Sequence, residues 1–411
     1  MNRLLYTLFL FSSTISFAQD PWKIEANKID PSNYYGVTVA NGMIGVVSSP
    51  EPFKVKEVVL AGAYDLYGRG RVSNFLRSFN LLNMNLDIDG KRITNSSVTN
   101  MKQTLDMRGA SFTTSFEYGD KATITNTYYS LRQLPFTVLM DVTITAKKDI
   151  TITGSSVMEA PDALRDVQNY YNEIDRPHVV ISLLTSAAKS PTGKLLMCAS
   201  NTFLFSEAHG SEPKVIHEMW DNNMHLMKFT KTIKAAQSYR FSIVGSSITS
   251  AHHDDPLNEA ERITIYAKLE GRDRLLHFHQ KAWDDLWKSD IQIDGDAQVQ
   301  QDVHSMLYHL YSFVREGTAY SPSPMGLSGL GYNGHVFWDA ELWMYPAVLV
   351  MHPELAKSMI EYRYQRLEAA KKNAFAIGFK GAMFPWESAE SGVEETPVWA
   401  LSGPFEHHIT A

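Results

Sequence analysis

The stretch Gly331-Tyr332-Asn333-Gly334-His335-Val336-Phe337-Trp338-Asp339-Ala340-Glu341-Leu342-Trp343 decides how we interpret the chain around it. It places two carboxylates, Asp339 and Glu341, among aromatic rings directly after residues 318–334, a loop rich in glycine, serine and proline. A pyranose ring has apolar C–H faces that stack on indole and hydroxyl groups that donate to carboxylates. Trp338 beside Asp339 therefore suits a sugar site on a loop that a rigid scaffold holds in place.

The same residues also allow a purely structural interpretation. Phe337, Trp338 and Trp343 would then be core aromatics, and Glu341 would lie on a solvated helix face, because buried aromatic rings mostly serve packing. Residue types alone leave both interpretations open.

Apolar spacing predicts helices on both sides of this stretch. Apolar residues recur at three and four positions over 299–314 and again over 353–376, which is typical of one buried helix face. Earlier in the chain, Asp255-Pro256 begins a helix that Gly271 ends, and residues 273–288 repeat the spacing. These earlier helices predict a helical linker.

The first part of the chain, residues 33–249, follows a period of two. Residues 110–118 and 122–129 alternate apolar and polar positions and are rich in Thr, Tyr and Phe. Gly119-Asp120 between them is a tight-turn pair, which predicts a β-hairpin. Many such segments separated by short turns indicate a large antiparallel β-sandwich.

Composition excludes several classes of protein. The 411 residues are 44% hydrophobic and carry a net charge of −7, with no Lys/Arg run longer than a pair, so we expect no nucleic-acid partner. The single cysteine, Cys198, rules out an internal disulfide and is predicted to be a buried small hydrophobe. The sequence has no phosphate-binding glycine loop and no zinc-binding histidine pair, so we expect no cofactor and no metal ion.

Residues 1–18 are typical of a signal peptide. Asn2-Arg3 supply a positive start, residues 4–11 an apolar segment, and Ser16-Phe17-Ala18 a cleavage site before Gln19. No later stretch approaches twenty apolar residues, so we expect no membrane span. Export without disulfides favours a periplasmic or extracellular location.

The order of these parts resembles glycoside hydrolase family 65. A β-sandwich, a helical linker and helical hairpins that begin with residues 331–339 are similar to that family, which includes kojibiose, maltose and trehalose phosphorylases, acid trehalases, and glucosidases of kojibiose and glucosylated hydroxylysine. Three later segments also resemble the family's successive barrel loops, namely residues 383–389, 394–397 and 406–411.

The resemblance implies a multidomain β + α fold. We expect a signal peptide over 1–18, an N-terminal antiparallel β-sandwich domain over 19–250, a helical linker over 251–295, and the first part of an (α/α)6 toroid over 296–411. Twelve helices with their loops need roughly 300 residues at about 11 residues per helix. We therefore expect the toroid to be incomplete in this chain, and the 411-residue form alone to be inactive.

The resemblance also implies a site. Trp338 would stack on the non-reducing glucose and Asp339 would accept hydrogen bonds from its hydroxyls. Four further candidates for the same pocket wall are Tyr332, His335, Trp386 and Glu387. For His335 we favour a loop-packing role, and for Glu406, His407 and His408 a place at the rim or at a helix start is an equal alternative.

The implied activity is that of an exported inverting α-glucosidase, which hydrolyses kojibiose-like or trehalose-like α-glucosides. Inversion needs a carboxylic acid and, on the opposite ring face, activated water or inorganic phosphate. The family's general acid lies in a Gly-Pro-Asp-Glu loop that this sequence lacks. We therefore expect the general acid downstream of Ala411 and assign no catalytic residue. Export favours water over phosphate, because glucose 1-phosphate made outside the cytoplasm is hard to recover.

Three alternatives remain at this point. The first is an inverting disaccharide phosphorylase that releases β-glucose 1-phosphate. The second is another α-toroid glycosidase with Glu387 or Glu406 as acid and Asp339 as base. The third is a non-catalytic carbohydrate-binding protein. Linkage specificity and a homodimeric state are also open, and the expected partner is a small-molecule α-glucoside.

The leader gives a first prediction. Export should remove residues 1–18, so amino-terminal sequencing of protein secreted by a bacterial host should begin at Gln19. A mature protein that begins at Met1 or Asn2 would contradict it.

Overall fold

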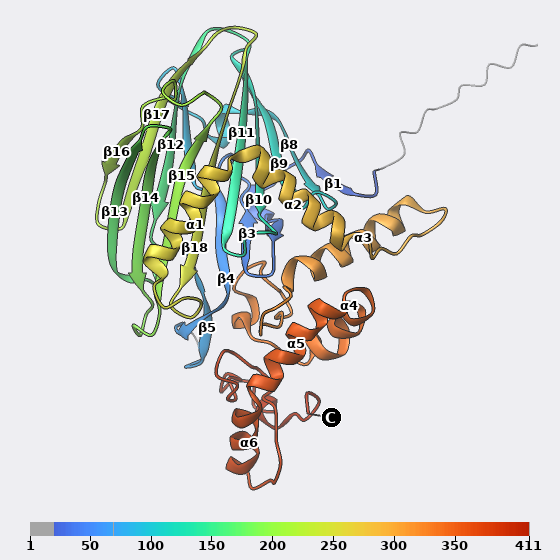
Figure 1. Cartoon of the computed structure of the whole chain (residues 1–411). Helices are drawn as coiled ribbons and strands as arrows, with labels where there is room; N and C mark the ends of the chain where they lie inside the picture. The colour runs from blue at the N-terminus through green and yellow to red at the C-terminus, as the bar shows by residue number, and fades with distance from the viewer. Residues whose placement is uncertain (1–19, 69, 411) are drawn as a thin grey trace, which may run out of the picture.

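The computed structural model describes residues 20–68 and 70–410. Figure 1 shows the sheets at one end of the molecule with the first two helices lying against them, and the last helices at the other end, next to the C-terminus. The expected signal peptide, residues 1–18, and the last residue, Ala411, lie outside the described residues.

The strands form three antiparallel sheets within the described residues. The orders are β1-β8-β9-β10-β11-β18-β15-β14-β13, β16-β17-β12-β6-β7 and β2-β3-β4-β5. The bounds are β1 Lys23–Ala26, β2 Thr38–Ala40, β3 Ile44–Ser48, β4 Val55–Leu66, β5 Ser73–Arg77, β6 Met84–Ile88, β7 Lys91–Arg92, β8 Thr99–Asp106, β9 Ser111–Tyr118, β10 Ala122–Ser130, β11 Thr137–Ala146, β12 Ile150–Glu159, β13 Arg165–Arg176, β14 Val179–Lys189, β15 Leu196–Phe205, β16 Ile216–Met219, β17 Met224–Ile233 and β18 Ser238–Thr249.

Alternating side chains explain the register of these sheets. The predicted hairpin is confirmed as β9 and β10, which pair from Ala122 with Tyr118 onward, while Gly119 turns at φ 50°. Along β9 every second residue is buried, because period-two side chains point to opposite faces of a strand.

The core lies between the nine-stranded sheet and the two smaller sheets. Phe229 of β17 and Phe241 of β18 show the packing across the layers, with ring centroids 4.9 Å apart at 76°. Cys198 on β15 is fully buried, as predicted, and burial raises the pKa of its thiol to about 12. An N-terminal β-sandwich is therefore confirmed.

Helices follow the sandwich in the order that the sequence predicts. The bounds are α1 Pro256–Glu270, α2 Arg272–Leu286, α3 Ala297–Phe313, α4 Tyr345–Met351, α5 Pro353–Gln365 and α6 Leu367–Ala376. Asp255 caps α1 by accepting from the Asn258 amide at 3.2 Å, and Gly271 at φ 75° ends it. Helix α1 lies against β15 and β18, where Thr264 donates to the Ser200 carbonyl at 3.1 Å (Figure 1).

The helix predicted over 353–376 is interrupted at Arg366, which was not expected. The Arg366 amide donates to the Arg363 carbonyl at 3.0 Å. In a continuous helix this amide would donate to the Tyr362 carbonyl, which here accepts from the Arg366 guanidinium at 2.9 Å. The guanidinium also lies over the Tyr362 ring, 3.7 Å from its centroid. The chain bends there into α6.

A buried arginine joins the sandwich to the helices. Arg132, between β10 and β11, donates to the carbonyls of Tyr311 at 2.8 Å and Val314 at 3.0 Å, at the C-terminal end of α3. Its amide donates to Nδ1 of His279 on α2 at 3.1 Å. The carbonyl end of a helix attracts a cation, and the guanidinium and the backbone amide of this one residue together connect the sheet, the linker and α3. Burial nevertheless lowers the pKa of Arg132 to about 9.

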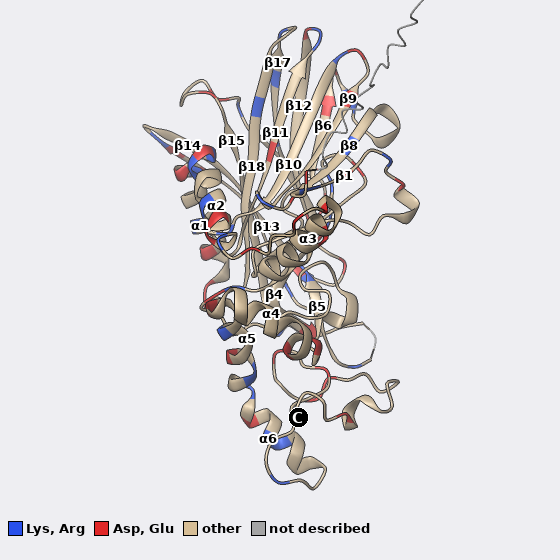
Figure 2. Ribbon diagram, turned by 90° about the vertical axis from the view of Figure 1, so that its right-hand side faces the viewer, with Lys and Arg blue, Asp and Glu red and all other residues tan. Residues whose placement is uncertain are grey.

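The charges are well mixed over the surface. Figure 2 shows basic and acidic segments alternating along α1, α2, α5 and α6. In residues 20–68 and 70–410, no helix is long and apolar enough to cross a bilayer.

Two buried histidines predict how stability depends on pH. Burial lowers the pKa of His279 and of His225, each to about 4, from an ordinary value of 6.5. The folded protein therefore favours neutral imidazoles, so their stabilisation is complete above pH 6.5 and is lost as the pH falls toward 4. Each should add about 1.4 kcal/mol per pH unit to the slope of unfolding free energy in that window.

Urea denaturation from pH 4.5 to 7 measures this slope. His279→Gln and His225→Gln should each flatten it, even if they also lower stability at pH 7. A slope that is unchanged in both variants would contradict the assignment.

Candidate functional site

The stretch 331–343 forms an unusual connection into α4. Tyr332 and Asn333 have φ of 52° and 55°, and Gly334 follows at 70°, so three successive residues adopt the left-handed region. Residues Ala340–Met344 then form one π-helical turn that continues into α4. Such turns are often found at functional sites.

A second loop lies beside this stretch. Val336 and Ser388 exchange both backbone hydrogen bonds, at 2.8 and 3.0 Å. The Tyr362 hydroxyl of α5 donates to Ser388 Oγ and the Ala389 carbonyl at 2.8 and 2.7 Å. Because of this pairing, residues 335–339 and 386–389 form one surface.

Aromatic rings gather on that surface. The half-buried rings of Trp338 and Trp386 lie 5.9 Å apart between centroids, inclined at 30°, and His408 lies 5.1 Å from Trp338 and 5.5 Å from Trp386. Phe337 is buried behind them, edge-on to Trp386. The structural interpretation therefore holds for Phe337, whereas Trp338 is partly exposed and Trp343 is exposed.

The two carboxylates of the stretch differ in their surroundings. Glu341 accepts two hydrogen bonds from Arg363 of α5, from Nε at 2.7 Å and Nη2 at 3.1 Å, so it is not on a solvated helix face. Asp339 is half-buried, and in the described part of the chain its carboxylate makes no hydrogen bond or ion pair. Asp339 thus has its acceptor oxygens free for a ligand.

His335 and Glu387 form a buried pair between the two loops. Nδ1 of His335 lies 2.7 Å from Oε2 of Glu387, and Nε2 lies 2.5 Å from the carbonyl of Ser73 at the start of β5. His335 is fully buried and Glu387 nearly so. The structure therefore buries His335 between Glu387 and the Ser73 carbonyl, and it brings the sandwich into contact with these loops.

Two further glutamates hold the second loop. Glu394 accepts from the amides of Trp386 and Thr396, both at 2.9 Å, and Glu395 accepts from the Ser73 amide at 2.9 Å and its hydroxyl at 3.0 Å. The sequence assigned no role to Glu394, Glu395 or Ser73. The sequence identified the segment Glu394-Glu395-Thr396-Pro397 only through its resemblance to a barrel loop of the family.

The remaining candidates lie at the rim. Tyr332 is 62% exposed, and its ring meets Phe337 edge-on at 5.6 Å. Glu406 pairs with His408 at 3.2 Å, and the His408 side chain is 51% exposed whereas that of Glu406 is 33% exposed. In the described residues, no group of three or more His, Cys, Asp or Glu side chains is arranged to hold a metal ion.

No residue of this surface is assigned as the general acid. We expect it downstream of Ala411, and Ala411 itself lies outside the described residues. The position of the acid and the inactivity of the 411-residue form therefore stay predictions.

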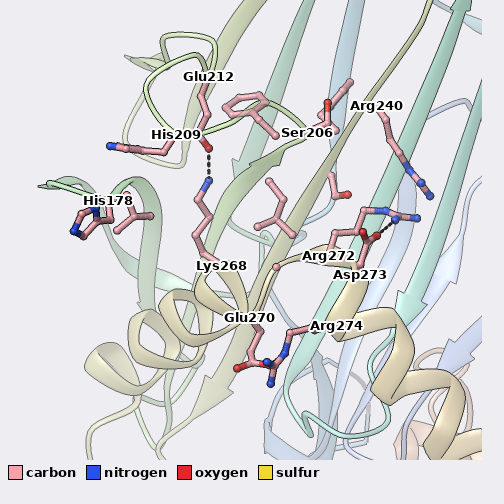
Figure 3. A pocket seen from close by; sticks show the side chains of 16 residues that line it. His178, Ser206, His209, Glu212, Arg240, Lys268, Glu270, Arg272, Asp273 and Arg274 are labelled. Carbon is pink, nitrogen blue, oxygen red and sulfur yellow. Dashed lines mark hydrogen bonds and ion pairs between the residues drawn. The ribbon is translucent and has the colours of Figure 1, made fainter.

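A separate cavity of about 580 Å³ lies between the sandwich and the linker (Figure 3). Its cations are already paired: Lys268 with Glu212 at 3.0 Å, Arg274 with Glu270 at 2.9 Å, and Arg272 with Asp273 and the buried Asp141. All its lining residues lie between 178 and 274, remote in sequence from the aromatic surface. Arg272–Asp141 joins α2 to β11, Arg274–Glu270 joins α2 to α1, and Lys268–Glu212 joins α1 to the β15–β16 loop, so we interpret these pairs as structural.

Comparison with known proteins gives two family matches. Residues 36–286 match the model described as glycosyl hydrolase family 65, N-terminal domain, and residues 304–408 match the family's central catalytic domain. A solved structure assigned as a kojibiose phosphorylase from the human microbiome aligns with a TM-score of 0.75 over 92% of this chain and 53% of its own, at 18% identity. This likeness shows a shared fold.

Curated relatives carry hydrolase and phosphorylase names. The kojibiose hydrolase of Mucilaginibacter mallensis is 71% identical over 99% of this chain, and that of Flavobacterium johnsoniae is 58% identical over 100%. The chain spans 60% of the length of each. The kojibiose phosphorylase of Thermoanaerobacter brockii is 43% identical over 34% of this chain and 20% of its own.

The left-handed turn gives a prediction. A Cβ added at Gly334 would lie 2.2 Å from Cγ of Phe75, so Gly334→Ala combines backbone strain with a clash. We expect a loss of about 1–2 kcal/mol from the backbone and a further loss of about 1–3 kcal/mol from overpacking. Gly381→Ala is the matched control, because Gly381 also has positive φ, +99°, but faces open space. Equal losses of unfolding free energy in the two variants would contradict the proposed fit against Phe75.

Proposed function

The chain belongs to glycosyl hydrolase family 65, and from that premise we propose that it carries the glucose-binding surface of an inverting α-glucosidase that hydrolyses kojibiose-like disaccharides. The whole protein's activity is proposed because the chain spans 60% of its relatives' length. One observation carries the proposal: Asp339, whose carboxylate has no partner among the described residues, directly follows Trp338, whose ring lies near those of Trp386 and His408.

Each part of this surface suits one part of a glucose ring. The open face of Trp338 can cover the apolar C–H face of the sugar, which water solvates poorly. The Asp339 carboxylate can accept from two hydroxyls, and such charge-assisted bonds are stronger than neutral ones. Trp386 and Glu387 extend the wall on the neighbouring loop, where Trp386 is fixed by the Glu394 carboxylate.

Hydrolysis is favoured over phosphorolysis. The two relatives that match the chain nearly end to end are named kojibiose hydrolase, whereas the Thermoanaerobacter brockii phosphorylase matches only a third of it. Inversion would then use one carboxylic acid on the leaving oxygen and a second carboxylate that activates water on the opposite ring face. We assign neither role to a residue here, and we propose export on the basis of the leader sequence.

Substitutions made in a form as long as the kojibiose hydrolases test the site, because the 411-residue form is predicted to be inactive, and the first is at Asp339. Asp339→Asn keeps the shape but removes charge-assisted bonds worth about 1.5–3 kcal/mol each. Because hydroxyl contacts strengthen toward the oxocarbenium-like transition state, kcat of kojibiose hydrolysis should fall as well as affinity. If kinetics per folded molecule are unchanged and only Tm falls, Asp339 is structural and the proposed role is wrong.

Trp338→Ala should act differently. It removes the stacking face and should mainly raise KM, measured by glucose release from kojibiose. Trp220→Ala is a matched control, since Trp220 is 53% exposed but lies on the sandwich next to β16. A control variant with the same rise in KM would show that the effect is not specific to the site.

A further inference from the structure

The two ring nitrogens of His335 both face acceptors. Oε2 of Glu387 lies 2.7 Å from Nδ1, and the Ser73 carbonyl oxygen lies 2.5 Å from Nε2. A carbonyl oxygen can only accept a hydrogen bond, so Nε2 carries a hydrogen. An ionised carboxylate also only accepts, so the short Nδ1 contact needs one more proton, either on the ring or on Glu387.

His279 shows the contrasting arrangement in the same molecule. Its Nε2 faces a carbonyl, that of Gly109 at 3.0 Å, but its Nδ1 faces a donor, the Arg132 amide at 3.1 Å. One ring hydrogen satisfies both contacts, so His279 is a neutral imidazole. Both histidines are buried, at 1% exposure or less, so the neighbours and not the burial distinguish them.

The extra proton belongs on His335. A carboxylic acid releases its proton more readily than an imidazolium in water, and a buried imidazolium is stabilised when a carboxylate lies next to it. We propose that His335 is a positioning residue: a buried imidazolium, with its ring orientation fixed by the Ser73 carbonyl of the sandwich, that orients the Glu387 carboxylate and keeps it ionised at the wall of the sugar site. The sugar-binding part of this proposal rests on the proposed function.

The sandwich fixes the carbonyl that His335 needs. Glu395 holds Ser73 by both its amide and its hydroxyl, and the Tyr64 hydroxyl of β4 donates to the Gly334 carbonyl at 2.5 Å. Strands β4 and β5 descend from the sheets toward the helices (Figure 1). These bonds hold Ser73 and Gly334 in place on either side of the contact between His335 and the Ser73 carbonyl.

The pair with His335 engages one carboxylate oxygen of Glu387 and leaves the other available. Its Oε2 is taken by His335, whereas its Oε1 makes no hydrogen bond within the described part of the chain. By contrast, Glu394 and Glu395 on the same loop are engaged by backbone and hydroxyl donors. An ionised Glu387 with one free oxygen is an acceptor for a sugar hydroxyl, next to Trp386.

Nitrogen-15 NMR of histidine-labelled protein tests the proton assignment directly. An unprotonated ring nitrogen resonates far from a protonated one, so at neutral pH His335 should show two protonated nitrogens and His279 only one. Assignment uses His335→Gln and His279→Gln. One unprotonated nitrogen on His335 in the wild-type chain overturns the proposal.

Glu387→Gln provides the second arm. A glutamine amide can donate to Nδ1, so His335 should change to the single-proton pattern of His279, and affinity for glucose should fall about tenfold or more. Glu390→Gln is the matched control, because Glu390 lies on the same loop but pairs with Lys194 at the surface. Its His335 signals should match those of the wild type.

The two arms separate this inference from the proposed function. If His335 shows two protonated nitrogens but the wild-type chain binds no glucose, the proton assignment is supported and the sugar-binding role is wrong. If glucose binds but His335 in Glu387→Gln still shows two protonated nitrogens, Glu387 is not the partner of the second proton and the proposal is overturned.

Discussion

The fold depends on a buried guanidinium that has no carboxylate partner among the described residues. Arg132 leaves the tip of the β10–β11 connection and donates to the last carbonyls of α3, while its own amide holds His279 of the linker. A buried cation is costly unless fixed dipoles surround it, and the C-terminal end of a helix supplies them. This contact is one of those that hold the C-terminal end of α3 against the sandwich, and α3 leads into the following loop.

A second junction carries the sandwich into the site itself. Strands β4 and β5 reach the helical part, where Tyr64 bonds to Gly334 and Ser73 bonds to His335 and Glu395. These contacts determine the turn at 331–334 and the pairing of Val336 with Ser388. The sugar site we propose is thus built by both domains, although its aromatic rings all come from the helical one.

The acidic side chains near this surface divide into two groups. Glu341, Glu394 and Glu395 are occupied by Arg363, by backbone amides and by Ser73, so their charges maintain the loops. Among the described residues, both carboxylate oxygens of Asp339 and one of Glu387 have no hydrogen-bond partner. A polar ligand needs acceptor oxygens that no protein group already occupies. The free oxygens therefore support Asp339 and Glu387 as candidate ligand contacts more strongly than their residue type alone does.

The sequence by itself determined the elements and the family. Period-two alternation predicted the β9–β10 hairpin, the Asp255 and Gly271 signals predicted α1, and the 331–343 stretch pointed to Trp338 and Asp339. Only the tertiary structure decided the break at Arg366, the pairing of Glu341 with Arg363, and the contact of His335 with Ser73, 262 residues away. Strand and cap signals act over a few neighbouring residues, whereas these contacts join side chains and carbonyls that meet only after the sandwich and helices have packed.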